Sequence, residues 1–454
     1  MAKEKKQIGV EPVYDATLLG RPRMIVLGFQ HMFAMFGATV LVPILTGLSV
    51  SATLLFAGLA TLFMHFVTGK KVPVFLGSSF AFLGGYFAVV ASGAELGLSQ
   101  AEALPYACVG VACAGLLYLV LALICKAFGS KNVMRYFPPV VTGPIIIAIG
   151  LILAPSAINN CSTNWGIALI AIVVVIVCNI WGKGMIKIVP ILMGVLVSYL
   201  VAAITGNVDF SGVKEAAWIG LPFQMQDTVF GLLGSGSVNT GLLISSIIMI
   251  VPIAFATMME HVGDISAIGG AIEKNLIEDP GLHRTLIGDG IGTTIAALFG
   301  APANTTYGEN TGVLVLTKVY DPKVVRLAAI YAIVLSFCPK FAALISAMPA
   351  ATIGGVSIIL YGMISAVGVR NMVENHTDFQ KSRNVIVAAV ILGLALGVNF
   401  SDLGAISFSV GNISIALSGL AVASIVGILL NAILPGKRDE YMPNQENSGS
   451  LGKF

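Results

Sequence analysis

Residues 301–310 read Ala-Pro-Ala-Asn-Thr-Thr-Tyr-Gly-Glu-Asn, and residues 73–80 read Pro-Val-Phe-Leu-Gly-Ser-Ser-Phe. Each stretch starts with residues that favour extended backbone and continues with small polar residues and a glycine. Each then leads into an apolar helix that is too short to cross a bilayer alone. Interrupted segments at corresponding positions in two halves of a membrane protein indicate a binding site between them. The two stretches therefore predict a membrane protein with two related halves.

The composition excludes an ordinary soluble protein. Of the 454 residues, 57% are hydrophobic and 10% are charged, whereas soluble domains carry about 25% charged residues. So few charges cover a protein of this size only if most of its surface faces lipid. Charge-free runs such as residues 24–69 and 136–182 are each long enough for two helices of about 20 residues. From these runs we predict 14 transmembrane segments, the last at 411–435.

The basic residues are distributed on one side of these segments. If both chain termini are cytoplasmic, all of the 25 Lys and Arg residues except Lys214 and Lys340 fall on the cytoplasmic side. This is the bias that the positive-inside rule describes, and omitting one segment would disrupt it downstream. We therefore predict a multi-pass protein of the cell inner (cytoplasmic) membrane with both termini in the cytoplasm.

A second pair of motifs indicates that the halves are related. Pro138 and Gly143 in the fifth predicted segment recur 211 residues later as Pro349 and Gly354 in the twelfth. The two broken segments are likewise third in their sets of seven. Because each set has an odd number of segments, the two halves have opposite orientations in the membrane. The alternative is that Gly and Pro are simply common in membrane helices, which does not explain the paired placement.

Four acidic residues lie at or near membrane depth: Glu260, Asp264, Asp289 and Glu309. A charge there costs at least about 2.5–3.5 kcal/mol, so such residues face a cavity, pair with one another or hold a proton. Glu260 and Asp264 are four apart and share a helix face. Glu309 opens the second short helix, where free N–H groups favour a carboxylate. For Asp264 and Asp289, a bracing role near the inner surface is an equally good explanation.

Aromatic and histidine side chains are further candidates. Phe80, Tyr307 and Tyr361 could stack on a flat heterocycle, although packing against the core or lipid explains each one as well. His31 is a candidate for proton coupling or for a hydrogen bond between helices, and His261 is left open. No His or Cys residues have metal-ligand spacing and no nucleophile–base motif is present. We therefore expect no metal, no cofactor and no enzyme activity.

Four motifs together resemble those of bacterial uracil permeases in the nucleobase–ascorbate transporter (nucleobase:cation symporter 2) family. They are QHMFAMFGAT at residues 30–39, GSSFAF at 77–82, EHVG at 260–263 and NTTYGEN at 304–310. The ENTG string at 309–312, followed by Thr317 and Lys318, is similar to the signature of the wider family. The resemblance extends from about residue 8 to residue 435, which is essentially the whole hydrophobic region.

The resemblance implies an all-α membrane protein with 14 transmembrane segments in two inverted repeats of seven. It also implies short antiparallel strands in the third and tenth segments. A core domain would contain segments 1–4 and 8–11, and a gate domain segments 5–7 and 12–14. The expected boundaries are a cytoplasmic tail at 1–23, core halves at 24–127 and 237–347, gate halves at 128–236 and 348–435, and a second cytoplasmic tail at 436–454.

The resemblance further implies a substrate site between the two broken segments. Glu260 and Glu309 match the two substrate-binding carboxylates of the family, and Phe80 matches its stacking aromatic residue. The remaining expected substrate-binding residues are Ala38, Tyr361, Tyr307 and Gly308, the last through its backbone N–H. The residues expected in proton coupling are Glu260, Asp264, Asp289 and His31.

The function implied by the resemblance is proton-coupled symport of uracil by alternating access. The proton is the coupling ion, the partners are the nucleobase and the lipid bilayer, no nucleic acid is bound, and a homodimer is left open. Aspartates at positions 264 and 289 are more similar to those of xanthine and urate transporters, so a xanthine or purine nucleobase:proton symporter is the alternative. A sulfate or bicarbonate carrier is disfavoured, because two pocket carboxylates would repel an anion.

Overall fold

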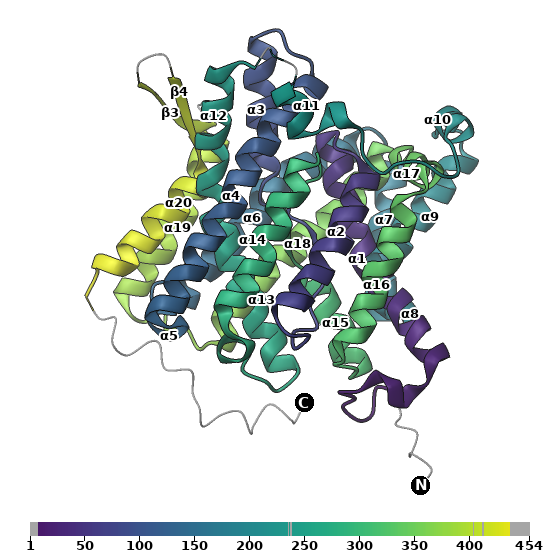
Figure 1. Ribbon diagram of the computed structural model, residues 1–454, viewed down its shortest axis with the longest axis horizontal. Helices are drawn as coiled ribbons and strands as arrows, with labels where there is room; N and C mark the ends of the chain where they lie inside the picture. The colour runs from purple at the N-terminus through teal and green to yellow at the C-terminus, as the bar shows by residue number, and fades with distance from the viewer. Residues whose placement is uncertain (1–7, 235, 237, 403, 411–412, 436–454) are drawn as a thin grey trace.

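The computed structural model describes residues 8–234, 236, 238–402, 404–410 and 413–435. Most of the described chain is helical, and the long helices run side by side (Figure 1). The elements up to residue 234 are η1 (Ala16–Leu19), α1 (Arg21–Thr46), α2 (Val50–Val67), β1 (Leu76–Ser78), α3 (Leu83–Glu95), α4 (Gln100–Phe128), α5 (Ser130–Met134), α6 (Pro139–Ser162), α7 (Trp165–Ile180), α8 (Met185–Ile188), α9 (Pro190–Ile204), α10 (Ser211–Glu215), η2 (Met225–Asp227) and α11 (Val229–Gly234).

The elements after residue 238 begin with the long bent run that carries two of the acids identified above. They are α12 (Thr240–Ile250), η3 (Val251–Ile253), α13 (Ala254–Ala271), η4 (Ile277–Gly281), α14 (Leu282–Leu298), β2 (Asn304–Thr306), α15 (Gly308–Thr317), α16 (Pro322–Ser336), α17 (Pro339–Ser346), α18 (Ala350–Glu374), α19 (Ser382–Phe400), β3 (Ala405–Val410), β4 (Ile413–Ser418) and α20 (Gly419–Ile433).

Seven helices of the described chain are long and apolar enough to cross a membrane, judged by length and composition. They are α1, α2, α4, α6, α18, α19 and the continuous run Thr240–Ala271. Helices α16 and α17, which meet at an angle of 91°, add an eighth if they are counted as one span. Helices α7, α9 and α20 are apolar but shorter. The count of 14 segments therefore stays a prediction, while the mostly helical membrane architecture is confirmed.

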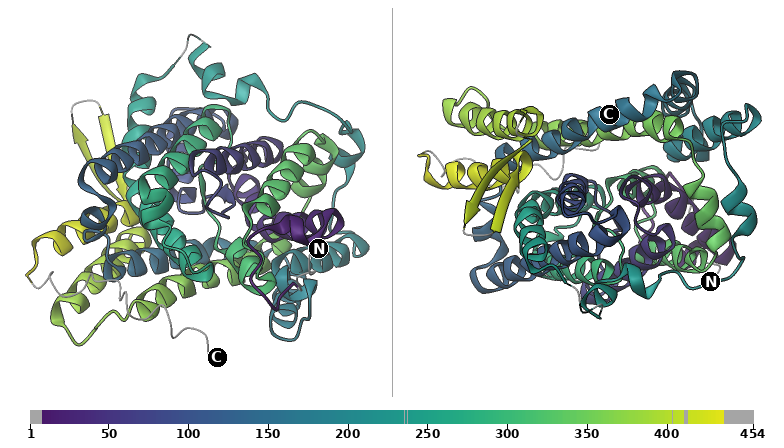
Figure 2. Two further views of the ribbon diagram at one scale, coloured as in Figure 1. Left: turned by 60° about the horizontal axis from the view of Figure 1, so that its bottom comes forward. Right: turned by 90° about the horizontal axis from the view of Figure 1, so that it is seen from above.

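The helices form two packed groups. In the first group α14 contacts α2 and α4, and α16 contacts α1 and α2. In the second group α6 contacts α18 and α19, α7 contacts α9 and α18, and α19 contacts α20. Seen from above, the second group forms a layer along one side of the first (Figure 2). The division of the chain into core and gate domains stays a prediction, and it is compatible with these two groups.

Helices α6 and α18 pack closely through glycines. A Cβ atom on Gly368 would lie 2.6 Å from the carbonyl oxygen of Gly143, and one on Gly354 would lie 2.7 Å from that of Ala157. Only a residue without a side chain allows this approach of two backbones. Gly143 and Gly354 are 211 residues apart in the sequence, and so are Ala157 and Gly368. Adding 211 to the numbers of Gly143 and Ala157 gives Gly354 and Gly368, so each contact joins positions that correspond to those of the other contact.

The two segments interrupted by small polar residues meet in a short antiparallel sheet. Strand β1 pairs with β2 so that Leu76 lies opposite Thr306 and Ser78 opposite Asn304. One further backbone hydrogen bond lies beyond each end of the sheet, from Ser79 N–H to Ala303 and from Tyr307 N–H to Phe75. Each strand is followed by a short helix, α3 or α15. Segments more than 220 residues apart in the sequence are thereby joined in the middle of the helical bundle.

A second antiparallel sheet pairs β3 with β4, with Ala405 opposite Ser418. The predicted start of the last transmembrane segment at residue 411 is therefore wrong, because α20 begins at Gly419. Large apolar residues alternate with serine or alanine in these strands, and an alternation of period two is typical of strands rather than helices. The Ser418 side chain accepts a hydrogen bond from the Ala421 N–H and caps the helix. Residues 411 and 412 lie outside the described chain.

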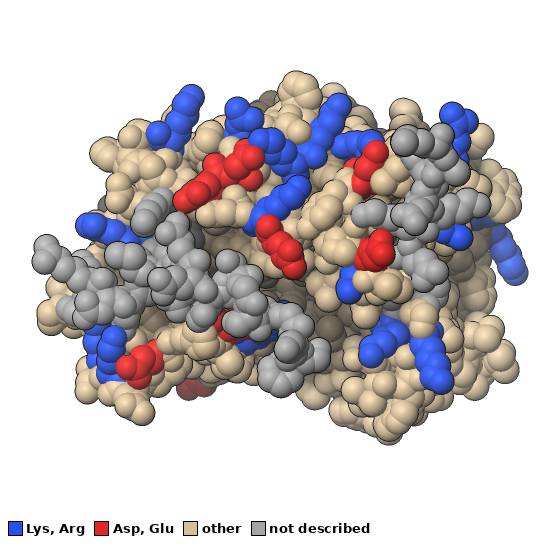
Figure 3. All heavy atoms as spheres, turned by 90° about the horizontal axis from the view of Figure 1, so that it is seen from below, with Lys and Arg blue, Asp and Glu red and all other residues tan. Residues whose placement is uncertain are grey.

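Basic side chains gather at one end of the bundle. Helix α1 begins and α20 ends at the lower end in Figure 1, and Figure 3 shows Lys and Arg spread over this face. The ion pairs of this face include Lys71 with Asp279 and Arg370 with Glu374. The acids Glu260, Asp264, Asp289 and Glu309 lie on α13, α14 and α15 instead, and of these four only Asp289 is fully buried.

Candidate substrate site

Helix α13 presents two carboxylates toward strand β2. The Thr306 hydroxyl donates to Oδ2 of Asp264 at 2.6 Å, and the Thr305 hydroxyl lies 3.5 Å from Oε2 of Glu260. Glu260 and Asp264 lie one helical turn apart, so a single strand can reach both of them. Both residues are partly exposed. Each carboxylate therefore keeps lone pairs that a ligand could reach.

Strand β2 is held in place by the next helix. The Thr293 hydroxyl of α14 lies 3.1 Å from both the backbone N–H and the carbonyl oxygen of Asn304. The N–H of Ala303 donates to the hydroxyl of Tyr86 at 3.3 Å. Buried backbone groups outside helices need such partners. Thr293 and Tyr86 thus hold the backbone of the strand whose threonines contact Glu260 and Asp264.

Glu309 lies at the start of the short helix that follows β2. It is the second residue of α15, after the exposed Gly308, and is itself partly exposed. The first N–H groups of a helix have no partner within that helix, and the helix dipole adds positive potential there. Glu309, Asp264 and Asp289 all lie within electrostatic range of Glu260. The four predicted acids are therefore brought together in one region.

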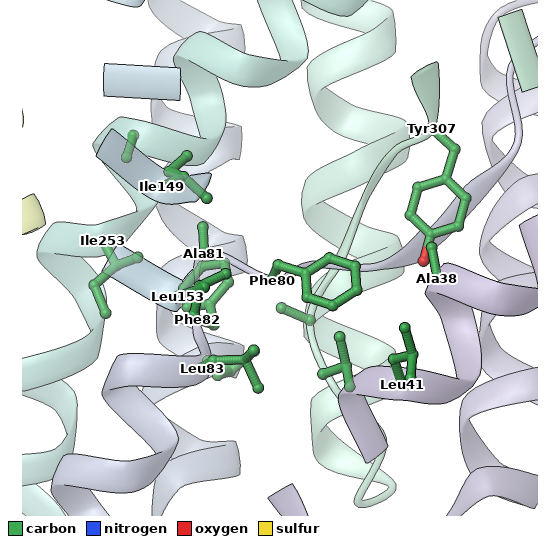
Figure 4. Packing of buried hydrophobic residues seen from close by; sticks show 14 of the residues in the cluster. Ala38, Leu41, Phe80, Ala81, Phe82, Leu83, Ile149, Leu153, Ile253 and Tyr307 are labelled. Atoms are coloured by element: carbon green, nitrogen blue, oxygen red, sulfur yellow. The ribbon is translucent and has the colours of Figure 1, made fainter. Parts of the chain in front are cut away.

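The predicted aromatic residues take two different positions. Phe80, just before α3, meets Tyr361 of α18 edge to face, with ring centroids 5.6 Å apart. In Figure 4 the Phe80 ring lies between Leu153 and Leu41. Tyr307 lies beside Ala38, and its hydroxyl donates to the Ser78 carbonyl at 3.1 Å.

All four predicted contact residues are buried in this conformation: Phe80, Tyr361, Tyr307 and Ala38. A cavity beside Phe80 has a volume of about 20 Å³ and is lined by Gly84, Leu153, Asn399 and Ser418 among others. Small-molecule pockets are typically about 300–1,000 Å³. The space around Phe80 and Tyr361 is therefore too small for a substrate in this conformation. The assignment of these four residues to substrate contact stays a prediction.

The predicted proton-coupling residues differ in their surroundings. His31 of α1 is fully buried, and its Nδ1 lies 3.2 Å from the side-chain nitrogen of Asn310, which also donates to the His31 carbonyl at 3.0 Å. His31 thus joins α1 to the start of α15, next to Glu309. Asp289 is fully buried on α14, and it lies within electrostatic range of Asp264. The roles of His31 and Asp289 in proton transfer stay predictions.

One polar residue of this region was left undecided by the sequence. His261 is fully buried and places Nδ1 2.7 Å from Oδ2 of Asp289. The sequence did contain a signal for this pair. A histidine and an aspartate within the hydrophobic region of a membrane protein each cost free energy when unpaired, and pairing reduces that cost. The sequence did not reveal which helix face carries His261, since its neighbour Glu260 points toward β2.

Comparison with known proteins places the chain in a family. The Xan_ur_permease model, described as the Permease family, matches residues 22–404. A uracil permease of Bacillus caldolyticus is 39% identical over 442 residues, which cover 94% of this chain and 96% of that protein. A uracil permease of Bacillus subtilis (strain 168) is 36% identical over 462 residues, which cover 98% and 99% of the two chains.

The fold is shared with a more distant transporter. The transmembrane domain of the cyanobacterial bicarbonate transporter BicA superposes with a TM-score of 0.59 at 15% sequence identity. The superposition covers 90% of this chain and 96% of that domain. At this level of identity the similarity establishes the fold alone. Taken with the family match, it follows that the chain is a member of the Permease family and is a membrane transport protein rather than an enzyme.

Proposed function

We propose that the chain imports uracil together with a proton by alternating access. The observation that carries the proposal is the gathering of Glu260 and Glu309 beside the paired strands, next to helix starts with free N–H groups. The names of the uracil permeases that it resembles over nearly their full length support the same substrate.

The chemistry of uracil fits these groups. Uracil is flat and neutral, with two N–H donors and two carbonyl acceptors. The carboxylates of Glu260 and Glu309 accept hydrogen bonds from the N–H groups, and backbone N–H groups at the starts of α3 and α15 donate to the carbonyls. The rings of Phe80 and Tyr361 stack on the base once the space between them widens enough to admit it. A site built of such donors and acceptors rejects analogues that leave them unpaired.

Proton coupling follows from the neutrality of the substrate. The membrane potential exerts no force on uracil, so accumulation requires an ion that moves with it. An acidic side chain at membrane depth can carry a proton across as its uncharged form, and Glu260 on α13 is therefore the proposed proton carrier. The protonated site binds uracil most tightly, and both are released on the cytoplasmic side when the core domain moves against the gate domain.

We further propose 14 membrane-crossing segments in two inverted repeats within the inner membrane, with both termini in the cytoplasm. The equivalent contacts of Gly143 and Gly354 across α6 and α18 support the repeats. The basic face in Figure 3 supports the orientation, because cytoplasmic loops carry an excess of Lys and Arg.

A xanthine or purine nucleobase:proton symporter is the second candidate. Asp264 and Asp289, which resemble residues of xanthine and urate transporters, favour it. Transport of an anion such as bicarbonate is disfavoured although the fold is shared with BicA. Several carboxylates in one buried region repel a negative substrate.

Uptake of labelled uracil by purified protein in proteoliposomes tests the proposal. We expect saturable uptake that requires an inwardly directed proton gradient and is blocked by excess unlabelled uracil. Competition by thymine, xanthine and hypoxanthine separates the two candidates. Gradient-dependent uptake of xanthine without uptake of uracil would replace the first proposal by the second, and uptake of neither would exclude both.

A further inference from the structure

A buried histidine–aspartate pair lies beside the candidate substrate site, and the proposed cycle gives its histidine no role. His261 of α13 places Nδ1 2.7 Å from Oδ2 of Asp289 on α14. Both side chains have an exposed fraction of 0%. Hydrogen bonds to the remaining polar atoms stabilise a buried pair, and among the described residues Oδ1 of Asp289 has no such partner. The partner of the second ring nitrogen therefore decides which charge the pair can carry.

That partner is Thr285. Its hydroxyl oxygen lies 3.0 Å from Nε2 of His261 and also 3.0 Å from the carbonyl oxygen of Leu282. A hydroxyl has one hydrogen to donate. If Thr285 donates to Leu282, Nε2 must carry a hydrogen, and with a hydrogen on Nδ1 as well the ring is an imidazolium that faces the Asp289 carboxylate. If Thr285 donates to Nε2, the ring is neutral and its one hydrogen is on Nδ1.

The two arrangements differ by one proton and keep the same contacts between side chains. In both, the Nδ1–H of His261 donates to Asp289. The pair is neutral in the first arrangement and negative in the second. Conversion requires a rotation of the Thr285 hydroxyl and no movement of a heavy atom. The ring can therefore take up a proton at Nε2, and lose it again, while α13 and α14 stay packed.

The other two buried histidines of the described chain have different partners. Nδ1 of His31 faces the side-chain nitrogen of Asn310 at 3.2 Å. Nε2 of His65 lies 2.8 Å from the carbonyl oxygen of Val74, to which a neutral ring donates. Neither of these contacts supplies a carboxylate that would stabilise an imidazolium. A buried carboxylate partner thus distinguishes His261 from both.

The titratable groups that face the pair come from two elements. Tyr118 of α4 lies edge-on to His261 with ring centroids 6.3 Å apart, and it is within electrostatic range of Asp289. Glu260 and Asp264 of α13 are also within electrostatic range of Asp289. A negative charge on the pair therefore opposes ionisation of Glu260. Proton binding at His261 and at Glu260 is coupled through this repulsion.

We propose that His261, held between Asp289 and Thr285, binds a second transported proton in addition to the proton assigned to Glu260. This inference rests on the proposed proton-coupled uptake. The proton passes from water to Nε2 on the outer side and from Nε2 to water on the inner side, and no other bond changes. The pair is protonated, and therefore neutral, while the substrate is bound. It is deprotonated, and therefore negative, when the protein returns without substrate.

The variant His261→Asn tests the inference. Its side-chain N–H takes the place of Nδ1–H and donates to Asp289, but an amide cannot take up a proton. Each coupled proton supports about tenfold accumulation of a neutral substrate per pH unit of gradient. We expect the variant to accumulate about tenfold less uracil per pH unit and to carry one proton fewer per uracil, read with an entrapped pH dye. Counterflow exchange of uracil should be retained, and His65→Asn serves as the control histidine variant.

An unchanged proton-to-uracil ratio in folded His261→Asn overturns the inference. If that variant does not fold, the wild-type protein with ¹⁵N-labelled histidines in lipid decides the question by nuclear magnetic resonance. The spectrum should contain one buried ring that changes from two protonated nitrogens to one as the pH is raised. A spectrum without such a ring also overturns it. Failure of the proposed function is seen separately, as a lack of gradient-driven uracil uptake by the wild-type protein.

Discussion

Glu309 combines a carboxylate with the free N–H groups of a helix start. If it accepts a hydrogen bond from uracil, the substitution Glu309→Gln removes a charge-assisted bond worth about 1.5–3 kcal/mol. We expect the affinity for uracil to fall by about 10- to 150-fold, measured by equilibrium binding of labelled uracil in detergent. Glu95→Gln, at the exposed end of α3, is the matched control. An affinity within about twofold of wild type would remove Glu309 from the proposed site.

At the residue scale, the sequence predicted the acids better than their partners. Glu260 and Asp264 were expected on one helix face because of their spacing, and both do reach β2. The bond between His261 and Asp289 depends on the rotation of two helices about their axes, which apolar sequences on all sides of a helix do not specify. The same holds for Tyr307, whose hydroxyl bond to Ser78 follows from the strand pairing.

Strand β1 depends on the lack of a side chain at Gly77. A Cβ atom there would lie 2.4 Å from the ring of Tyr307. We expect Gly77→Ala to destabilise the protein by about 1–3 kcal/mol, seen as a lower midpoint in a thermal shift assay in detergent. Gly84→Ala is the control, because nothing lies within 4 Å of a Cβ atom at that position. Adding Tyr307→Leu should restore part of the stability, and no restoration would show that the clash is not the cause.

The N-terminal segment, residues 9–20, is attached to the end of α15. The N–H of Gly9 donates to the Thr317 carbonyl at 2.9 Å, and the N–H of Val13 donates to the Lys318 carbonyl at 2.8 Å. Hydrogen bonds from Thr17 and Lys323 lower the pKa of Asp15 to about 2, so this carboxylate stays charged at physiological pH. The segment thus connects the surface of the basic end to the helix that carries Glu309.

Asp321 is the residue through which this attachment can be tested. Its carboxylate accepts from the N–H of Ala16 at 2.8 Å and from the N–H of Lys323 at 2.9 Å. Asp321→Ala leaves the buried Ala16 N–H unpaired, at a cost of about 1–3 kcal/mol. We expect tryptic cleavage after Arg23 to become about 5- to 150-fold faster, followed by mass spectrometry. Asp209→Ala, in an exposed loop, should leave the cleavage rate unchanged, and equal rates in both variants would contradict the prediction.

At the element scale, the sequence indicated the two broken segments because Gly, Pro and small polar residues interrupt apolar runs. It did not indicate β3 and β4, since residues 405–418 are apolar enough to resemble the start of a helix. Their alternation of large apolar residues with serine or alanine was the available signal. The attachment of residues 9–20 to Thr317 and Lys318 joins parts of the chain some 300 residues apart, and no local pattern encodes such a contact.

Two connections between the packed groups are tied together by Lys340. One connection runs from α9 to α12, and the other from α16 to α18. The Lys340 ammonium donates to the Val213 carbonyl at 3.0 Å and lies 5.2 Å from the centre of the Trp218 ring. Its backbone N–H donates to Ala217, and the Gly220 N–H donates back to Phe337. The two connections should therefore move as one unit when the groups shift.

The substitution Lys340→Met removes the ammonium but keeps the length of the side chain. Hydrogen bonds from a charged group contribute about 1.5–3 kcal/mol, so local opening of residues 213–220 should become about 10- to 150-fold more frequent. Hydrogen exchange read by mass spectrometry measures this change. Lys214→Met, which removes an exposed ammonium in the same loop, is the control. Equal protection in the two variants would show that Lys340 does not hold the loop.

At the scale of the whole molecule, charge distribution and the offset of 211 residues were the informative sequence features. They predicted related halves, and α6 and α18 do cross through residues at that offset. The sequence could not predict how the two packed groups sit against each other. That arrangement depends on contacts such as that of Gly37 on α1 with Ile191 on α9, where a Cβ atom on the glycine would lie 2.7 Å from the isoleucine side chain.

The pairing of early with late elements has a consequence for synthesis. Helices α2, α4 and α6 find their main partners in α14, α16 and α18. A ribosome adds about 5–20 residues per second, so α4 is complete on the order of ten seconds before α14 exists. During this interval the newly made half stays in the bilayer with its small-residue faces unmatched, including Gly115, which later packs against Gly290. A chain that ends after α11 would therefore insert into the membrane without its partner helices. We expect membrane proteases to degrade such a fragment.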